Sequence, residues 1–252
     1  ISACLVGSEM CIRDRRIEIL GEVMKGLTHF AKVYSQIGFL PSEPSYYNQL
    51  TARQMFSYAQ NLHGLSEENR EITDAYSERL KLDQNKQIAK MSLGNKRKVG
   101  IILSLIANPK LIVMDEPTSG LDPLIQHEVL DILEERAREG SGILLSSHNL
   151  PEIESICDRL MVIKDAHIVF TGTVSQIRAK KQKRITFEIQ NESQLSKLLK
   201  GIKVAELDQN SNFVTLLTGE PEELIPNLLS EKIYDFTVEN PTLEEMFISY
   251  YK

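Results

Sequence analysis

The sequence predicts a parallel α/β sheet followed by a second, smaller α/β domain. Short apolar segments alternate with amphipathic ones between residues 37 and 146, which is the order typical of β-α-β units. The 252 residues suffice for one large domain and a small one. With 42% hydrophobic and 25% charged residues, the composition is that of a globular protein and not of a disordered or fibrous one.

The charge and the cysteines exclude several classes of protein. The formal net charge of −6 argues against a dedicated nucleic-acid binder, which carries a basic surplus. No apolar stretch approaches the roughly 20 residues that a membrane span needs. Cys4, Cys11 and Cys157 are too few and too scattered for a disulfide framework or a four-ligand zinc site, so we expect a reducing cytosol.

Residues 1–15, ISACLVGSEMCIRDR, differ from the rest of the chain. They show no regular period, and no basic segment precedes the apolar run, as it would in a secretory signal. The string LVGSEMCIRD resembles a peptide that recurs when sequencing-adapter DNA is translated by mistake. We therefore expect a non-native leader over 1–15; the alternative is an ordinary disordered N-terminus.

The first regular elements follow residue 15. Alternation predicts a strand over 16–20 and a second over 37–40, each ended by glycine or proline. Thr51 and Gln54 fit a capping box that opens a helix ending at Gly64.

A further helix is expected after Ser66, with one apolar stripe formed by Ile72, Ala75, Tyr76 and Leu80. Together these two helices predict a compact helical insertion over 51–90. The elements expected after it are helices over 94–107 and 123–139 and strands over 111–114, 143–146, 160–163 and 167–170.

A run of basic residues marks a linker near residue 180, and it includes Lys180, Lys181, Lys183 and Arg184. Such a run is either a solvated linker or a patch that faces lipid. After it, Ile185, Phe187 and Ile189 alternate as a strand, and the pattern continues as β-α-β-β-α-β-α to a helix from Pro241. We assign 179–252 to the linker and a small C-terminal α/β domain.

Two carboxylates follow the most apolar strand. Asp115 and Glu116 come directly after Leu111–Met114, at the edge where ligands bind in open α/β sheets. One carboxylate there can hold Mg²⁺, and the second can accept a proton from an attacking water. The alternative is a strand end with two solvated acids.

Two helix starts lie close to this pair in the sequence. Asp122 and Pro123 are a natural N-cap and first helical residue, although this does not account for the whole string from Ser119. Ser92 opens another helix with Gly94, where a hydroxyl and free backbone amides form either a simple cap or an anion site.

A histidine follows the next strand, in the string Ser146-Ser147-His148. A lone histidine is commonly structural or exposed. Beside a carboxylate pair at a sheet edge, His148 could instead contact a terminal phosphate and an attacking water.

In this order, the motifs resemble those of the nucleotide-binding subunit of an ABC transporter. The strings MSLGNKRKVGIILSLIANPKLIVMDEPTSGLDP and SSHNLPEIESICDRLMVIKDAHIVFTGT are similar to its signature motif, Walker B strand with catalytic glutamate, D-loop and switch histidine. The tail, ending NPTLEEMFISYY, is similar to the accessory domain of exporter-type subunits. The resemblance implies a P-loop NTPase-like nucleotide-binding domain over 16–178, with its helical subdomain at about 49–90.

The resemblance also implies a role for each motif residue. Asp115 would help to hold Mg²⁺, Glu116 would be the general base, and His148 would contact the γ-phosphate and the water. The remaining residues would act across a dimer. The γ-phosphate of the ATP held by the partner subunit would be contacted by Ser92, Gly94 and Asn95. The D-loop at the dimer interface would be formed by Ser119 and Asp122.

The implied cofactors are ATP and Mg²⁺, and the implied partners are a second ATP-binding subunit, identical or different, and a membrane-spanning permease subunit. The chain would lie in the cytoplasm, peripheral on the inner face of the cell membrane, and no nucleic acid is expected. The alternative is a soluble ABC-type ATPase that acts on ribosomes or DNA. Such proteins usually carry two cassettes, coiled-coil arms or zinc-binding cysteines, which this sequence lacks.

The sequence departs from the family pattern at three places. Leu93 stands where the common signature has a glycine. Ser42, followed by Glu43, stands where the Q-loop within 37–47 has its glutamine, so either Glu43 substitutes or metal coordination is weaker.

The third departure is the phosphate-binding loop G-x-x-x-x-G-K-[ST], since none of the 13 glycines precedes a lysine. We therefore expect an N-terminally truncated chain that, as printed, binds ATP poorly and hydrolyses none.

Overall fold

A computed structural model describes residues 18–23, 33–65, 68–178, 182–210, 213–219 and 221–241. Residues 1–148 and 149–252 form two compact units. The expected leader, Ser66 and the helix expected from Pro241 lie outside the described residues, except for Pro241 itself. The predicted domain boundary near residue 178 stays a prediction.

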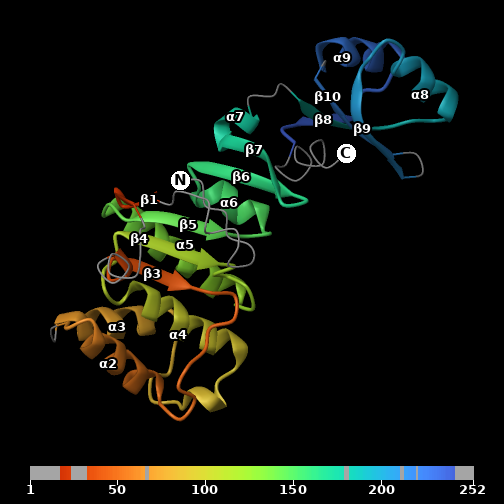
Figure 1. The fold of residues 1–252 in the computed structure, drawn as a ribbon. Helices are drawn as coiled ribbons and strands as arrows, with labels where there is room; N and C mark the ends of the chain where they lie inside the picture. The colour runs from red at the N-terminus through yellow and green to blue at the C-terminus, as the bar shows by residue number, and fades with distance from the viewer. Residues whose placement is uncertain are drawn as a thin grey trace. The chain divides into compact units, whose positions relative to one another are not determined.

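A parallel sheet forms the centre of the first unit (Figure 1). Its described strands are β3 (Ile37–Leu40), β4 (Leu111–Asp115) and β5 (Gly142–Ser146), in the order β3-β4-β5. All pairs are parallel, and the register sets Asp115 opposite Ser146. The predicted parallel α/β sheet is therefore confirmed, and the carboxyl ends of its strands share one edge.

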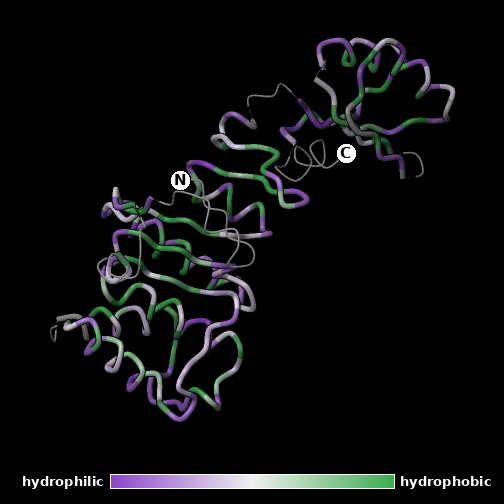
Figure 2. The backbone as a smooth tube through the Cα atoms, viewed as in Figure 1, coloured by the Kyte–Doolittle hydropathy of each residue, from purple (hydrophilic) through white to green (hydrophobic). Residues whose placement is uncertain are grey.

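Two helices cover this sheet. Helix α4 (Leu93–Leu105) packs on β3, and helix α5 (Pro123–Arg138) packs on β5. Most of α4 is buried around its circumference, as expected of a helix enclosed in a core. In Figure 2 strands β4 and β5 are coloured as hydrophobic, in agreement with fully buried Ile112 and Met114.

The helical insertion contains α2 (Ala52–Leu62), α3 (Glu68–Arg79) and a 3₁₀ turn, η2 (Ile88–Lys90). The predicted capping box is confirmed, since the Thr51 hydroxyl accepts from the Gln54 amide and the Gln54 side chain accepts from the Thr51 amide.

The predicted buried stripe of α3 is wrong at Ala75, which is exposed. Leu80 is buried as predicted, and the polar residues Thr73 and Ser77 are buried as well. The Ser77 hydroxyl donates to the Thr73 carbonyl at 2.7 Å, which satisfies this polar group inside the packed face.

The strand predicted over 16–20 differs from the structure in its described part. Strand β1 (Glu18–Ile19) turns back at Leu20 and Gly21 into β2 (Glu22–Val23). Both turn residues have positive φ, 52° and 80°, as a two-residue type I′ hairpin requires.

The second unit begins with α6 (Leu150–Ile156) and an antiparallel pair, β6 (Arg159–Lys164) and β7 (His167–Thr173). Leu160 and Val162 of β6 are buried with apolar neighbours from α6 and β7. Helix α7 (Val174–Arg178) follows β7. The predicted strands over 160–163 and 167–170 are confirmed.

The rest of this unit contains β8 (Lys183–Glu188), α8 (Glu192–Leu198), β9 (Val204–Asn210), β10 (Phe213–Thr218), α9 (Pro221–Ser230) and β11 (Phe236–Glu239). The strands form one antiparallel sheet in the order β11-β8-β10-β9. Ile185, Phe187 and Ile189 are all buried, as their alternation predicted, and they share a core with leucines of α8 and α9. Lys183 and Arg184 lie in β8, so the second half of the predicted basic linker is a strand.

In the part of the chain that the structure describes, no helix is both long and apolar enough to cross a membrane.

Candidate functional site

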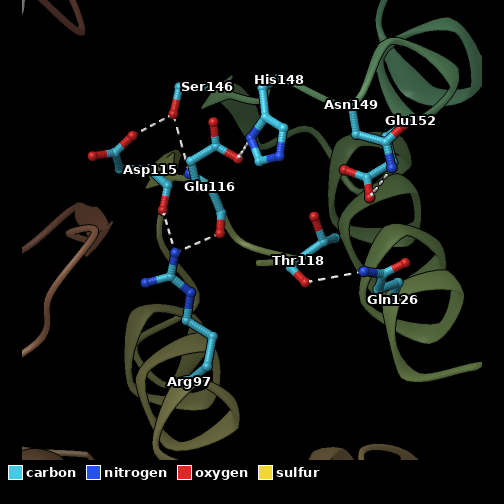
Figure 3. Close-up of polar contacts among 9 residues, drawn as sticks. All are labelled: Arg97, Asp115, Glu116, Thr118, Gln126, Ser146, His148, Asn149 and Glu152. Atoms are coloured by element: carbon cyan, nitrogen blue, oxygen red, sulfur yellow. Dashed lines mark hydrogen bonds and ion pairs between the residues drawn. The ribbon is translucent and has the colours of Figure 1, made fainter. Parts of the chain in front are cut away.

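The ends of β4 and β5 bring three polar residues together (Figure 3). The Ser146 hydroxyl donates to a carboxylate oxygen of Asp115 and accepts from the backbone amide of Glu116 at 3.0 Å. That amide also donates to the Ser146 carbonyl at 3.2 Å. One serine on β5 therefore orients both acids at the carboxyl end of β4.

Glu116 has an unusual backbone for a residue with a side chain. Its φ is +50°, in the left-handed region that non-glycine residues rarely adopt. Strain of this kind persists where the surroundings enforce it, and it concentrates at functional sites. Here it accompanies the turn from the strand end into the loop at 117–122.

The carboxylate of Glu116 contacts His148. Nδ1 of His148 lies 2.7 Å from Oε2 of Glu116. The histidine side chain is 81% exposed and the glutamate side chain 28% exposed, so a ligand from solvent can reach the pair. A carboxylate in contact with an imidazole, beside a second carboxylate, can accept and pass on a proton.

Arg97, on helix α4, lies behind the two acids and is 6% exposed. Its Nη2 donates to the backbone carbonyls of Asp115, at 2.8 Å, and of Glu116. Its Nη1 donates to the carbonyls of Pro41, at 3.1 Å, and Ser42, at 2.6 Å. Burial lowers the pKa of this guanidinium, and the nearby Asp115 and Glu116 oppose that effect.

The start of α4 meets the loop before α5. Ser92 caps α4 by accepting from the Asn95 amide at 3.3 Å, and Asp122 caps α5 by accepting from the Ile125 amide at 3.2 Å. A Cβ atom at Gly94 would lie 2.8 Å from the Gly120 carbonyl oxygen. The structure thus brings the first turn of α4 beside the loop that holds Ser119.

The segment after β3 carries Ser42 and Glu43 where the family pattern has its glutamine. Ser42 and Glu43 are both exposed, and it is the backbone carbonyl of Ser42 that Arg97 binds.

The acids at this edge can help to hold Mg²⁺ but cannot enclose it. Among the described residues, no group of three His, Cys, Asp or Glu side chains gathers around a common point. Mg²⁺ is typically held by one or two carboxylates together with phosphate oxygens and water, so Asp115 beside a bound nucleotide fits this ion.

Sequence reasoning missed Arg97 and the part that Ser146 plays. Arg97 binds only backbone carbonyls, which leave no signal in a sequence. Ser146 was noted only as part of the string before His148, although its place opposite Asp115 follows from the parallel register of β4 and β5.

The fold and the site define the class of an ATP-binding ATPase, and two family models agree. One, described as "AAA domain, putative AbiEii toxin, Type IV TA system", matches residues 18–154, more than half of the chain. The other, "ATP-binding protein DrrA1-3-like, C-terminal domain", matches residues 172–251.

Similar sequences specify the class further. An uncharacterized ABC transporter ATP-binding protein of Methanocaldococcus jannaschii is 32% identical over 176 residues, 69% of this chain and 67% of that protein. Another from Alkalihalophilus pseudofirmus is 30% identical over 226 residues, 84% of this chain and 82% of that protein. The chain belongs to the ABC transporter ATP-binding proteins, which are ATPases.

Solved structures are similar as well. A structure of an ATP-binding subunit of an ABC transporter has a TM-score of 0.60 and 32% identity, covering 66% of this chain and 70% of that one. A dimeric, post-hydrolysis ATP-binding cassette bound to ADP and phosphate has a TM-score of 0.56. At 20% identity, over 62% of this chain and 72% of that one, the second likeness shows the fold alone.

Proposed function

We propose that the native assembly containing this chain hydrolyses ATP at the carboxyl edge of β4 and couples closure of an ATP-bound dimer to transport through a separate membrane subunit. The observation that carries the proposal is the contact of 2.7 Å between Glu116 and His148, directly after Asp115. Membership of the family indicates ATP hydrolysis, and Glu116 and His148 are side chains suited to that reaction.

In this proposal Glu116 is the general base. Its carboxylate accepts a proton as water attacks the γ-phosphate, and His148 orients that water and contacts the phosphate. Asp115 helps to hold Mg²⁺, which when bound neutralises charge on the phosphate oxygens. Ser146 keeps both carboxylates in place through its hydrogen bonds to Asp115 and to the Glu116 amide.

The printed sequence lacks the loop that commonly binds the β- and γ-phosphates of ATP. Backbone amides of a glycine-rich loop and one lysine commonly neutralise the β- and γ-phosphates, and no glycine of this chain precedes a lysine. The acids alone repel ATP. We therefore propose that the 252 residues on their own bind ATP weakly and do not turn it over.

A second ATP-binding subunit, identical or related, would provide the residues that face the nucleotide from across a dimer. Leu93, the first residue of α4, and Leu124, the second residue of α5, are 78% and 75% exposed. They flank the residues proposed to face the partner's nucleotide and the dimer interface, namely Ser92, Gly94, Asn95, Ser119 and Asp122. Exposed leucines around polar nucleotide contacts are suited to an interface that closes and reopens.

The helical insertion is proposed to dock on the membrane subunit. Its entry carries an exposed aromatic pair, Tyr47 and Tyr58, with ring centroids 5.5 Å apart in an edge-to-face arrangement. Aromatic residues are enriched where proteins meet. A chain bound in this way lies at the cytoplasmic face of the membrane as a peripheral subunit.

The test uses the assembly purified from its native membrane. A multi-span protein is expected to co-purify, and Glu116→Gln is expected to abolish ATP hydrolysis while ATP still binds, since an amide cannot accept the proton. Glu134→Gln, on the exposed face of α5, is the control and should retain turnover. Near wild-type turnover by Glu116→Gln would exclude Glu116 as the base, and co-purification with ribosomes or DNA in place of a membrane protein would overturn the transport role.

A further inference from the structure

We propose that Arg97 is a positioning residue that holds the backbone of Glu116 and ties it to the segment at Pro41–Ser42. The inference rests on the proposed role of Glu116, because a positioning residue matters only if the group it holds is used. Its evidence, however, is the geometry of backbone carbonyls and does not involve a nucleotide.

The hydrogen bonds of Arg97 join three parts of the unit. One guanidinium on α4 donates to carbonyls at the end of β4, Asp115 and Glu116, and to carbonyls after β3, Pro41 and Ser42. A planar fork with five N–H donors can serve two pairs of acceptors at once, and an ammonium cannot do so with the same geometry.

The position of the bond to Glu116 explains why it matters. Glu116 has a φ of +50°, which its side chain disfavours, so its peptide groups must be restrained from both sides. Ser146 restrains the amide of Glu116, and Arg97 restrains the carbonyl. Together they aim the carboxylate at His148.

The segment at Pro41–Ser42 is fastened to the same helix by a second contact. The Tyr46 hydroxyl donates to the Lys96 carbonyl at 2.8 Å. Gly100 permits this approach, since a Cβ there would overlap the Tyr46 hydroxyl and the Leu40 side chain. A displacement of this segment is therefore transmitted through Arg97 to the backbone of Glu116.

The first measurement uses the unmodified chain. We expect the two Nη groups of Arg97 to give separate NMR signals with slow exchange with water, because both are buried and bonded. A single averaged signal, as a freely rotating guanidinium gives, would overturn the proposal without any variant.

The second measurement compares two buried arginines. Arg97→Lys is expected to move the ¹⁵N signal of His148 Nδ1 most of the way to its position in Glu116→Ala, where the contact is absent. It should also accelerate hydrogen exchange of the Glu116 amide by roughly tenfold or more, as expected when a charge-assisted hydrogen bond is lost.

Arg136→Lys is the matched control. Arg136 is 8% exposed. Its Nε, like that of Arg97, is buried and has no hydrogen-bond partner among the described residues. Its other nitrogens bind Asn108 and Glu139, away from Asp115 and Glu116. It should lower thermal stability without moving the His148 signal. An unchanged signal in folded Arg97→Lys, or an equal change in both variants, would overturn the proposal. Normal hydrolysis by Glu116→Gln would refute the base and leave the NMR result standing, so the two failures are distinguishable.

Discussion

Gly94, in the first turn of α4, faces the backbone carbonyl of Gly120, in the loop before α5. The ideal position of a Cβ at Gly94 is 2.8 Å from the Gly120 carbonyl oxygen and 3.7 Å from a methyl carbon of Leu121. Gly120 itself has a φ of +75°, which suits glycine. This close approach packs the first turn of α4 against the loop that leads into α5.

Replacing Gly94 by alanine should therefore destabilise the protein. In an unobstructed helix this change would be favourable, but here the methyl group overlaps a backbone oxygen, and we expect a loss of about 1–3 kcal/mol. Urea unfolding measures the change. Gly142→Ala is the control, since its nearest neighbours would lie at 3.7 Å, and a loss at Gly94 no larger than that at Gly142 would contradict the packing described.

Ser146→Ala should remove the hydrogen bonds through which the Ser146 hydroxyl holds Asp115 and Glu116. The variant loses the donor to Asp115 and one acceptor for the Glu116 amide, which still has the Ser146 carbonyl. We expect a loss of stability of about 0.5–1.5 kcal/mol and a larger relative loss of ATP turnover in the native assembly. Ser146→Thr retains the hydroxyl and should recover most of the activity; equal defects in both variants would argue against the hydroxyl.

The ion pair between α3 and α5 should make stability depend on pH. Arg79 donates to Glu135 at 2.6 and 3.0 Å, and this hydrogen bonding lowers the pKa of Glu135 below its ordinary value of 4.5. A lowered pKa adds stability above the ordinary value, and this stability is lost as the pH falls through the lowered pKa. Thermal melting of wild type and Glu135→Gln should differ at neutral pH and converge in acid; a constant difference would exclude the pair as its source.

Cys157 should react slowly at neutral pH. It follows the last residue of α6 and is half-buried, and burial raises the pKa of its thiol, with Asp158 adding to the effect. Because the thiolate is the reactive form, alkylation by iodoacetamide should be slower than in the denatured chain and should accelerate as the pH rises above 9. Mass spectrometry of the Cys157 peptide follows the rate, and equal rates in native and denatured protein would contradict this environment.

Elements with a strong local signal could be predicted from the sequence closely. Asp122 and Pro123 set the start of α5 at the expected residue, and the capping box at Thr51 set the start of α2. The apolar run after Lys110 predicted β4, and the two carboxylates lie at its carboxyl end as expected. In each case the signal is contained in a few consecutive residues.

Tertiary contacts decided the parts that could not be predicted. Ser77 can be buried because its hydroxyl finds a carbonyl in its own helix, so polarity misled the assignment of the α3 stripe. Leu20 adopts a positive φ, which is rare for leucine, so the sequence did not predict the hairpin of β1 and β2. The role of Arg97 depends on where four carbonyls meet, and only the folded chain places them.

Helix α4 links the backbone of Asp115 and Glu116, which Arg97 binds, to the N-terminal end of the helix. Ser92, at the start of the helix, and Arg97 are five residues apart, about 7.5 Å along the axis. In the proposed dimer, a shift of Ser92 against the partner's nucleotide would pass through the hydrogen-bonded turns of α4 to Arg97, behind Glu116. In the dimer proposed above, occupancy of one nucleotide site would therefore act on the backbone that holds Glu116 in the other.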